Sequence, residues 1–336
     1  MVRVAISAGF VLVALLGSPA QAVAPQVPAA AFAALPEVSD VEMSPDGRLL
    51  AWRDQSGPDS KVQIYDIDAK SYRRTLAIDP AMTLRSLLWA DDTTLLMNVS
   101  KVQVLPAEER KRRYTFFRTM SVDVVTGNSC MLLKSGSGME WVTGDELVAW
   151  HTTEPHSVIM ATMVYSPTAE REDMGTHIAN SRADSGWIGE LFRVDTRTGQ
   201  GAVIGEGDQY TEQWIVNADG APIARSEWRP ARKHYVIEAR RGAQWDQILE
   251  RDDDQLVLQG LSPDGKSVIA TGPGKDGWLG LWTIALDGSG ARQMHQKAAA
   301  NTENADVEDV IRDRFSGLPV SAVLGGLEPT TGSGSV

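Results

Sequence analysis

The chain is poor in cysteine and, beyond its first 22 residues, in long apolar runs. Cys130 is the one cysteine among 336 residues, so no disulfide can form within the chain. It lies in the apolar run CMLL, which favours a buried thiol packed as a small hydrophobic side chain. No run after residue 22 approaches the roughly 18 apolar residues of a membrane span, so we expect a soluble mature protein.

The first 22 residues have the three parts of a secretory signal peptide. A cationic start, MVR, precedes 13 apolar residues at 4–16, and Ala20-Gln21-Ala22 supplies small residues for cleavage. A membrane anchor is the alternative, but such a run spans only about two-thirds of a bilayer core. The sequence therefore predicts an exported protein, periplasmic or secreted, that begins at Val23 and is not inserted in the membrane after cleavage.

Positive charge is also scarce. The net charge is −12 at pH 7, and it becomes −13 when Arg3 leaves with the signal peptide. Such an acidic chain is poorly suited to the phosphate backbone of a nucleic acid. The basic clusters at 109–114 and 229–233 are local exceptions, and each is typical of a solvated turn between strands. We therefore expect no nucleic-acid partner.

Strand signals recur through the chain, while helix signals are few. Short runs rich in Val, Ile, Leu and Trp alternate with polar residues and end at Asp, Gly, Asn or Pro. A hairpin with an Asp- or Gly-rich turn occurs five times, at 41–52, 87–99, 140–150, 214–228 and 258–270. A second hairpin follows each one, at 62–78, 121–133, 190–204, 234–249 and 280–294. Four strands in about 45 residues are typical of a β-propeller blade.

The repeats predict an all-β, propeller-like array of about five four-stranded blades. We place this domain at 36–326, after a linker at 23–35 and before a disordered tail at 327–336. A sixth unit at 307–326 supplies one hairpin only, which leaves closure of the array open. Two unrelated hairpin-rich sandwiches are the alternative.

The tetrapeptide SPDG occurs twice, at 44–47 and 262–265. Pro, Asp and Gly each favour the backbone conformations of tight turns. We expect the two copies to form equivalent turns in the first and fifth blades.

Four stretches of the chain carry a family resemblance. They are ALPEVSDVEMSPDGRLLAW after the signal peptide, LRSLLWADDTTLLM, LFRVDTRTG and WIVNADGAPIAR. As an ordered set they resemble the N-terminal propeller of the prolyl oligopeptidase family of serine peptidases, especially bacterial dipeptidyl- and acylaminoacyl-peptidase-like members. SPDG turns also mark TolB-like propellers. The resemblance runs from about residue 35 to 329 and implies a propeller that caps an α/β-hydrolase domain and limits substrate size.

The catalytic half of such a peptidase is missing from this sequence. Its serine needs the pentapeptide G-x-S-x-G, which does not occur. Only 40 residues follow Gln296, whereas a hydrolase domain needs on the order of 200 or more. The resemblance thus implies a substrate-gating propeller truncated before its hydrolase domain, without catalytic residues, whose partner is a peptide, a protein or a separately encoded hydrolase domain. The alternative is a self-sufficient periplasmic propeller that binds protein or peptide, as TolB-like proteins do.

Candidate binding residues lie in a polar insertion at about 152–187. In the related peptidases, acidic and arginine side chains of propeller loops hold a peptide terminus. By that resemblance the candidates here are Glu170, Glu172, Asp173 and Arg182. A solvated loop without a ligand is the alternative.

The sequence predicts neither a metal site nor a cofactor. His151 and His156 bracket a segment that contains Pro155, and their spacing suits neither one helix face nor one strand face. No Gly-rich phosphate loop follows a strand and opens a helix. Six of the ten tryptophans fall in expected strands, where packing between blades is the default: Trp52, Trp89, Trp141, Trp150, Trp214 and Trp282.

Overall fold

The computed structural model describes most of the chain beyond residue 35. The described ranges are 36–57, 59–107, 110–134, 146–166, 186–252, 255–274, 279–294 and 306–325. The fold below is that of the unit Glu37–Val336. Within the described ranges, no helix has the length and hydropathy needed to cross a membrane. The expected signal peptide, linker and tail lie outside the described residues.

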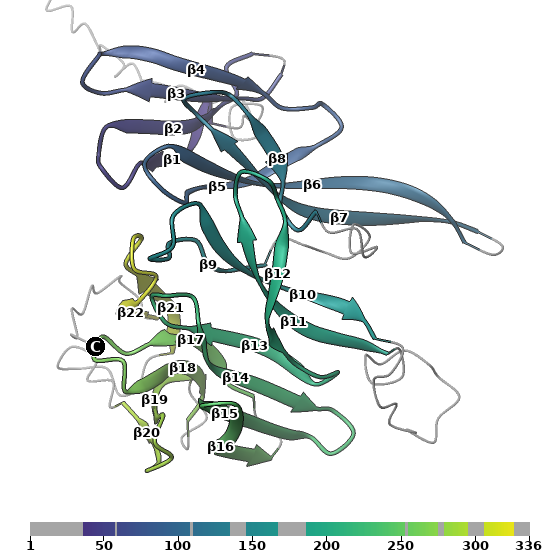
Figure 1. The fold of residues 1–336 in the computed structure, drawn as a ribbon, viewed down its shortest axis with the longest axis vertical. Coiled ribbons are helices and arrows are strands. Elements are labelled where there is room, and N and C mark those ends of the chain that lie inside the picture. Colours follow the sequence, from purple (N-terminus) through teal and green to yellow (C-terminus); the bar gives the residue numbers. More distant parts are fainter. Residues whose placement is uncertain are drawn as a thin grey trace, which may run out of the picture. The chain divides into compact units, whose positions relative to one another are not determined.

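Five four-stranded antiparallel sheets and one two-stranded sheet follow one another along the described chain (Figure 1). Blade 1 consists of β1 (Val38–Met43), β2 (Leu49–Asp54), β3 (Lys61–Asp66) and β4 (Ser71–Ala77). Blade 2 consists of β5 (Thr83–Trp89), β6 (Thr94–Ala107), β7 (Arg110–Asp123) and β8 (Ser129–Met131). Blade 3 consists of β9 (Glu146–Ala149), β10 (Ser157–Tyr165), β11 (Trp187–Asp195) and β12 (Gly201–Glu206).

Blade 4 consists of β13 (Thr211–Val216), β14 (Pro222–Arg229), β15 (His234–Arg241) and β16 (Gln244–Asp252). Blade 5 consists of β17 (Val257–Leu261), β18 (Ser267–Pro273), β19 (Leu279–Ala285) and β20 (Ala291–Gln293). The last hairpin is formed by β21 (Val307–Arg312) and β22 (Pro319–Leu324). In every blade the strands pair in sequence order, which is the pattern of a propeller blade. The prediction of five four-stranded units and one further hairpin is confirmed.

The apolar core is a series of layers, each between two consecutive sheets. Successive side chains of a strand point to opposite faces. In β10, Val158 and Met160 therefore pack with residues of blade 2, whereas Ile159 and Ala161 pack with residues of blade 4. One strand thus contributes to two layers, and a hydrophobic residue is needed at nearly every position.

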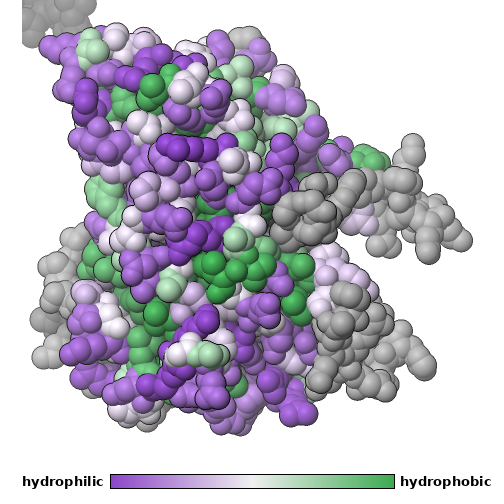
Figure 2. All heavy atoms as spheres, in the orientation of Figure 1, coloured by the Kyte–Doolittle hydropathy of each residue, from purple (hydrophilic) through white to green (hydrophobic). Residues whose placement is uncertain are grey.

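The last layer joins the last hairpin to blade 5. Val307 and Val310 of β21 pack against Ile269 and Leu281. Sheets therefore pack in chain order from blade 1 to the last hairpin, which does not fit two unrelated sandwiches. Hydrophilic residues cover most of the face in Figure 2, with small groups of apolar residues between them.

The two SPDG segments form the same turn, as predicted. In the first, Ser44 Oγ donates to Asp46 Oδ1 at 2.6 Å, and the following glycine has φ of 74°. In the second, Ser262 Oγ donates to Asp264 Oδ1 at 2.6 Å, and the following glycine has φ of 67°. Each serine Oγ also accepts the backbone N–H five residues later, at 2.9 and 3.0 Å. The hydrogen bond from the serine lowers the pKa of each aspartate.

Blade 3 departs from the prediction. Its first hairpin was expected at 140–150 and a polar insertion at 152–187. Instead, β9 starts at Glu146, and the chain returns as β10, which pairs with both β9 and β11. The prediction is wrong here because β10 is buried on both faces, so the run SVIMATMVY lacks the polar alternation of a half-buried strand.

Of the two basic clusters, only the second forms a turn. Arg229 ends β14, residues 230–233 connect it to β15, and Lys233 has φ of 48°. Residues 110–114 instead belong to β7, which pairs with β6 in a long hairpin (Figure 1). Cys130 in β8 is half-buried rather than buried, with Sγ 3.2 Å from Ser121 Oγ.

We expect Gly47→Ala to lower the free energy of unfolding by about 1 kcal/mol, because its φ lies in the left-handed region that strains a residue with a Cβ. No atom lies within 4 Å of the added Cβ, so backbone strain alone is tested. Gly57→Ala is the matched control, since its Cβ also meets no atom and its φ lies outside that region. Urea denaturation measures both variants, and an equal loss in the two would contradict the turn geometry.

Candidate functional site

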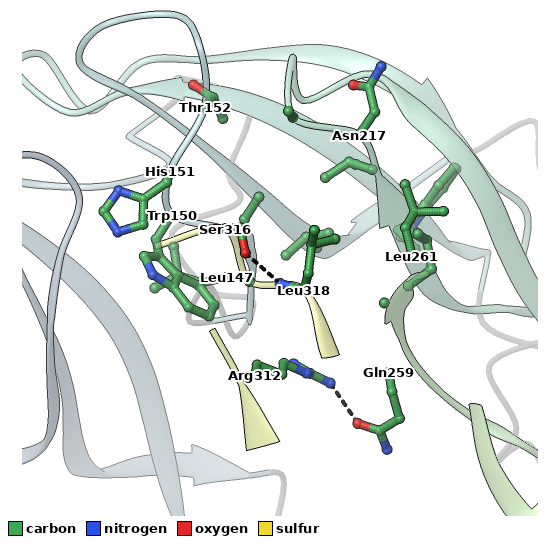
Figure 3. Close-up of a pocket in the computed structure, with 18 of the residues that line it drawn as sticks. Leu147, Trp150, His151, Thr152, Asn217, Gln259, Leu261, Arg312, Ser316 and Leu318 are labelled. Carbon is green, nitrogen blue, oxygen red and sulfur yellow. Dashed lines mark hydrogen bonds between the residues drawn. The ribbon is translucent and has the colours of Figure 1, made fainter. Parts of the chain in front are cut away.

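A cavity of about 380 Å³ lies between the first strands of blades 3, 4 and 5 and the turn of the last hairpin (Figure 3). We call it the first-strand cavity. β13 contacts both β9 and β17, so these three strands border one space. The cavity is lined by residues 146–153, 213–218 and 258–261, and by Arg312 and residues 315–318.

Much of the cavity wall is apolar. Leu147, Leu261 and Leu318 line it, and Figure 3 shows them around the same space as the Trp150 ring. Trp150 follows β9 rather than lying in a strand, and its Nε1 donates to the carbonyl oxygen of Arg314 at 3.0 Å. Because the last hairpin satisfies the polar atom of the indole, the ring serves the cavity as an apolar surface.

The turn of the last hairpin is shaped by Asp313. Its Oδ1 accepts the backbone N–H groups of Phe315 and Ser316 at 3.2 and 2.7 Å, and the Ser316 hydroxyl at 2.8 Å. These hydrogen bonds, led by that from the Ser316 backbone, hold the pKa of Asp313 below its usual value. Gly317 completes the turn with φ of 69°. The turn thereby presents the Phe315 ring, which is 46% exposed, at the cavity.

Contacts with three blades anchor the last hairpin. Arg314 forms an ion pair with Glu42 of β1, and its carbonyl oxygen binds Trp150 of blade 3. At blade 5, Gly260 approaches Pro319 so closely that an added Cβ would lie 2.8 Å from Pro319 Cδ. These contacts fix the position of the hairpin against the first strands of the blades.

Arg312 brings a positive charge to the cavity. Its Nη2 donates to Gln259 Oε1 at 2.8 Å, and Gln259 Nε2 donates to Thr271 Oγ1 at 2.9 Å (Figure 3 shows the first bond). The chain of bonds fixes the amide orientation of Gln259 and, through it, the guanidinium. Burial among the surrounding protein atoms lowers the pKa of Arg312, although its side chain still reaches solvent. An arginine so placed remains charged at neutral pH.

His151 lines the same cavity, and its lowered pKa favours the neutral ring at neutral pH. Burial is the largest influence and lowers the pKa of His151, while Asp91, Asp92 and Asp313 act in the opposite direction. Its ring centroid lies 6.1 Å from that of Phe315. His151 is therefore part of the aromatic wall rather than a second cation.

A charge network behind the cavity wall supports Trp214. The Arg225 guanidinium carbon lies 5.9 Å from the Trp214 ring centroid and 4.7 Å from that of Trp245. Arg225 also forms ion pairs with Glu227 at 3.0 Å and Glu238 at 2.7 Å. Burial raises the pKa of Glu227 to about 7, with Asp208 and Glu238 adding to the effect and the nearby arginines opposing it.

The two histidines expected in one loop line different cavities. His156 lies with Cys130 and Arg197 around a separate cavity of about 380 Å³ between blades 2 and 3. His156 Nδ1 is 3.3 Å from Asp91 Oδ2, and Arg197 donates to its Nε2. Within the described ranges, no three His, Cys, Asp or Glu side chains group as a metal site would require.

The four residues predicted to hold a peptide terminus, Glu170, Glu172, Asp173 and Arg182, lie outside the described residues. That prediction stays untested. The residues that do converge, Arg312 and Gln259, were not singled out in the sequence. The sequence feature that could have pointed to Arg312 is the isolated hairpin at 307–326. A single hairpin must pack against the blades, and the first strand of this hairpin ends in an arginine.

Comparison with known proteins finds a likeness in structure alone. No family model matches the chain, and no curated protein matches it. An acylaminoacyl peptidase from Pyrococcus horikoshii is 13% identical, with a TM-score of 0.47, over 86% of this chain and 42% of its own. An oligogalacturonate lyase in complex with manganese is 12% identical, with a TM-score of 0.48, over 82% of this chain and 67% of its own.

The β-propeller domain of the Trilobed protease from Pyrococcus furiosus is 10% identical, with a TM-score of 0.41, over 77% of this chain and 68% of its own. This chain spans less than half the length of the acylaminoacyl peptidase. The resemblance to peptidase propellers is thus a distant one of structure, without a shared sequence family. The activities of these proteins are not carried over to this chain.

We expect the free energy of unfolding of the wild type to fall as the pH rises from about 5 to about 7, and Glu227→Gln to remove this fall. The pKa of Glu227 is raised from 4.5 to about 7, so the unfolded chain releases this proton first, and ionisation favours unfolding as the pH rises through that window. Urea denaturation at pH 5 and pH 8 measures the effect, with Glu37→Gln at an exposed position as the control. A fall of equal size in wild type and Glu227→Gln would contradict the assignment.

Proposed function

We propose that this chain is an exported, non-catalytic propeller that binds a short peptide in the first-strand cavity. The observation that carries the proposal is the cavity itself, whose wall joins apolar side chains to polar groups on neighbouring strands. Its volume of about 380 Å³ falls within the range of about 300–1,000 Å³ of small-ligand sites. Such walls with a small number of fixed polar groups are typical of sites that recognise side chains and backbone together.

The groups that line the cavity suit a peptide. Trp150, Phe315 and Leu318 offer apolar surface for a side chain. The first strands β9, β13 and β17 each form one edge of their sheet, the position at which an extended chain can pair, and the Leu258 N–H of β17 is already bound to Gln213 Oε1 at 2.9 Å.

Two biological settings fit this binding role. One is the substrate-gating half of a prolyl oligopeptidase-family peptidase, supplied with a separately encoded hydrolase domain. The other is a self-sufficient binding propeller, comparable to TolB-like proteins. The ion pair of Arg314 with Glu42 joins the last hairpin to blade 1, a contact that the second setting would use.

Binding is tested with acetylated tripeptides that end in an apolar residue, such as acetyl-Ala-Ala-Phe, by calorimetry and by tryptophan fluorescence, since Trp150 and Trp214 line the cavity. We expect Phe315→Ala to weaken binding about tenfold through lost apolar contact. Val203→Ala, also at an exposed apolar position but in β12, is the matched control and leaves binding unchanged. An affinity that is the same in wild type and Phe315→Ala, or no binding at all, would contradict the proposal.

Catalysis is tested separately. We expect the purified chain to leave chromogenic dipeptidyl and acylaminoacyl substrates uncut, and to keep its mass after treatment with a serine-reactive phosphonate. The physical reason is that the sequence lacks the G-x-S-x-G turn that exposes and activates such a serine. A serine peptidase treated in parallel controls the reagents. Cleavage that the phosphonate abolishes, with a serine adduct seen by mass spectrometry, would refute a non-catalytic role.

A further inference from the structure

We infer that Arg312 binds a carboxylate of the peptide and that this carboxylate is the peptide's C-terminus. The inference rests on the proposed function and names the chemistry of one side of the first-strand cavity. Arg312 is the last residue of β21 and lines the cavity together with the turn that follows it.

The charge of Arg312 is not neutralised by its partner. It donates to Gln259, a neutral amide, and within the described residues no carboxylate forms an ion pair with it. Asp309 on the same strand favours the charged form of Arg312 through space, but it forms no ion pair with Arg312. His151, across the cavity, is uncharged. Glu146 also lines the cavity, but no ion pair joins it to Arg312, so a ligand carboxylate would meet a cation whose direct hydrogen-bond partner is neutral.

The guanidinium is also oriented in advance. A guanidinium carries five N–H donors in a rigid fork that matches the two oxygens of a carboxylate. One donor is engaged by Gln259, whose other end is fixed by Thr271. The side chain thus loses little freedom when it binds, which favours a bidentate contact over a single bond.

The C-terminus is the better source of the carboxylate because of what lies beside Arg312. Phe315 and Leu318 in the adjoining turn, and Trp150 behind it, line the same cavity. A terminal residue places its carboxylate and its apolar side chain on one carbon atom, so it meets the cation and the apolar wall together. An aspartate or glutamate within a peptide presents its carboxylate without such a neighbouring group.

Three probes test the inference: acetyl-Ala-Ala-Phe as the free acid, the same peptide as its C-terminal amide, and acetyl-Ala-Asp-Phe amide. We expect wild type to bind the free acid at least about tenfold more tightly than the amide, as loss of a charged hydrogen-bonded pair would give. The Asp-containing amide should bind like the plain amide. Raising NaCl from about 0.05 to about 0.5 M should weaken binding of the acid only.

Arg312→Gln should reduce affinity for the acid to that for the amide and leave the amide unchanged, while Arg312→Lys should retain part of the preference. Arg292→Gln, at an exposed arginine of β20 outside this cavity, is the control. Thermal melts confirm that each variant is folded.

The outcomes separate the two proposals. Equal binding of acid and amide by wild type would refute the carboxylate anchor and leave peptide binding standing. Tight binding of the Asp-containing amide, lost in Arg312→Gln, would confirm the anchor but assign it to side chains rather than to the C-terminus. No binding of any probe would refute the proposed function itself.

Discussion

Burial of both faces of each inner sheet, from blade 2 to blade 5, is the constraint on which this structure depends. A sheet that packs against a neighbour on each side must present apolar residues in both directions, and it gains stability in proportion to the area removed from water. β10 shows the result, since its consecutive residues Val158 to Ala161 alternate between the layers facing blade 2 and blade 4. The stacking order of the sheets then follows the order of the chain.

The candidate site is a by-product of this arrangement. The first strand of each blade has one edge unpaired within its own sheet, and three such edges enclose the cavity together with the last hairpin. The hairpin supplies what plain strands do not, namely a cation and an aromatic ring at the end of a tight turn. Asp313 and Gly317 fix the conformation of that turn, and the turn places Arg312 and Phe315 in the cavity wall.

The number and type of the repeated units could be predicted because turn chemistry is local. Ser44 and Asp46 form their hydrogen bonds within a few residues, so the same four letters give the same turn wherever they occur. The boundaries of blade 3 could not be predicted in this way, because β10 has no polar alternation to separate it from a core segment of another kind. Arg312 and Gln259 are 53 residues apart in the sequence, and no local sequence pattern predicts that they form a hydrogen bond.

The contacts that anchor the last hairpin also affect how the protein unfolds. Repeated units that contact only their chain neighbours can lose structure one at a time from either end. Here the hairpin at the far end of the array is tied to Glu42 in blade 1, to Trp150 in blade 3 and to Gly260 in blade 5. Fraying at that end therefore removes contacts from three units simultaneously, which couples the loss of the hairpin to blades 1, 3 and 5.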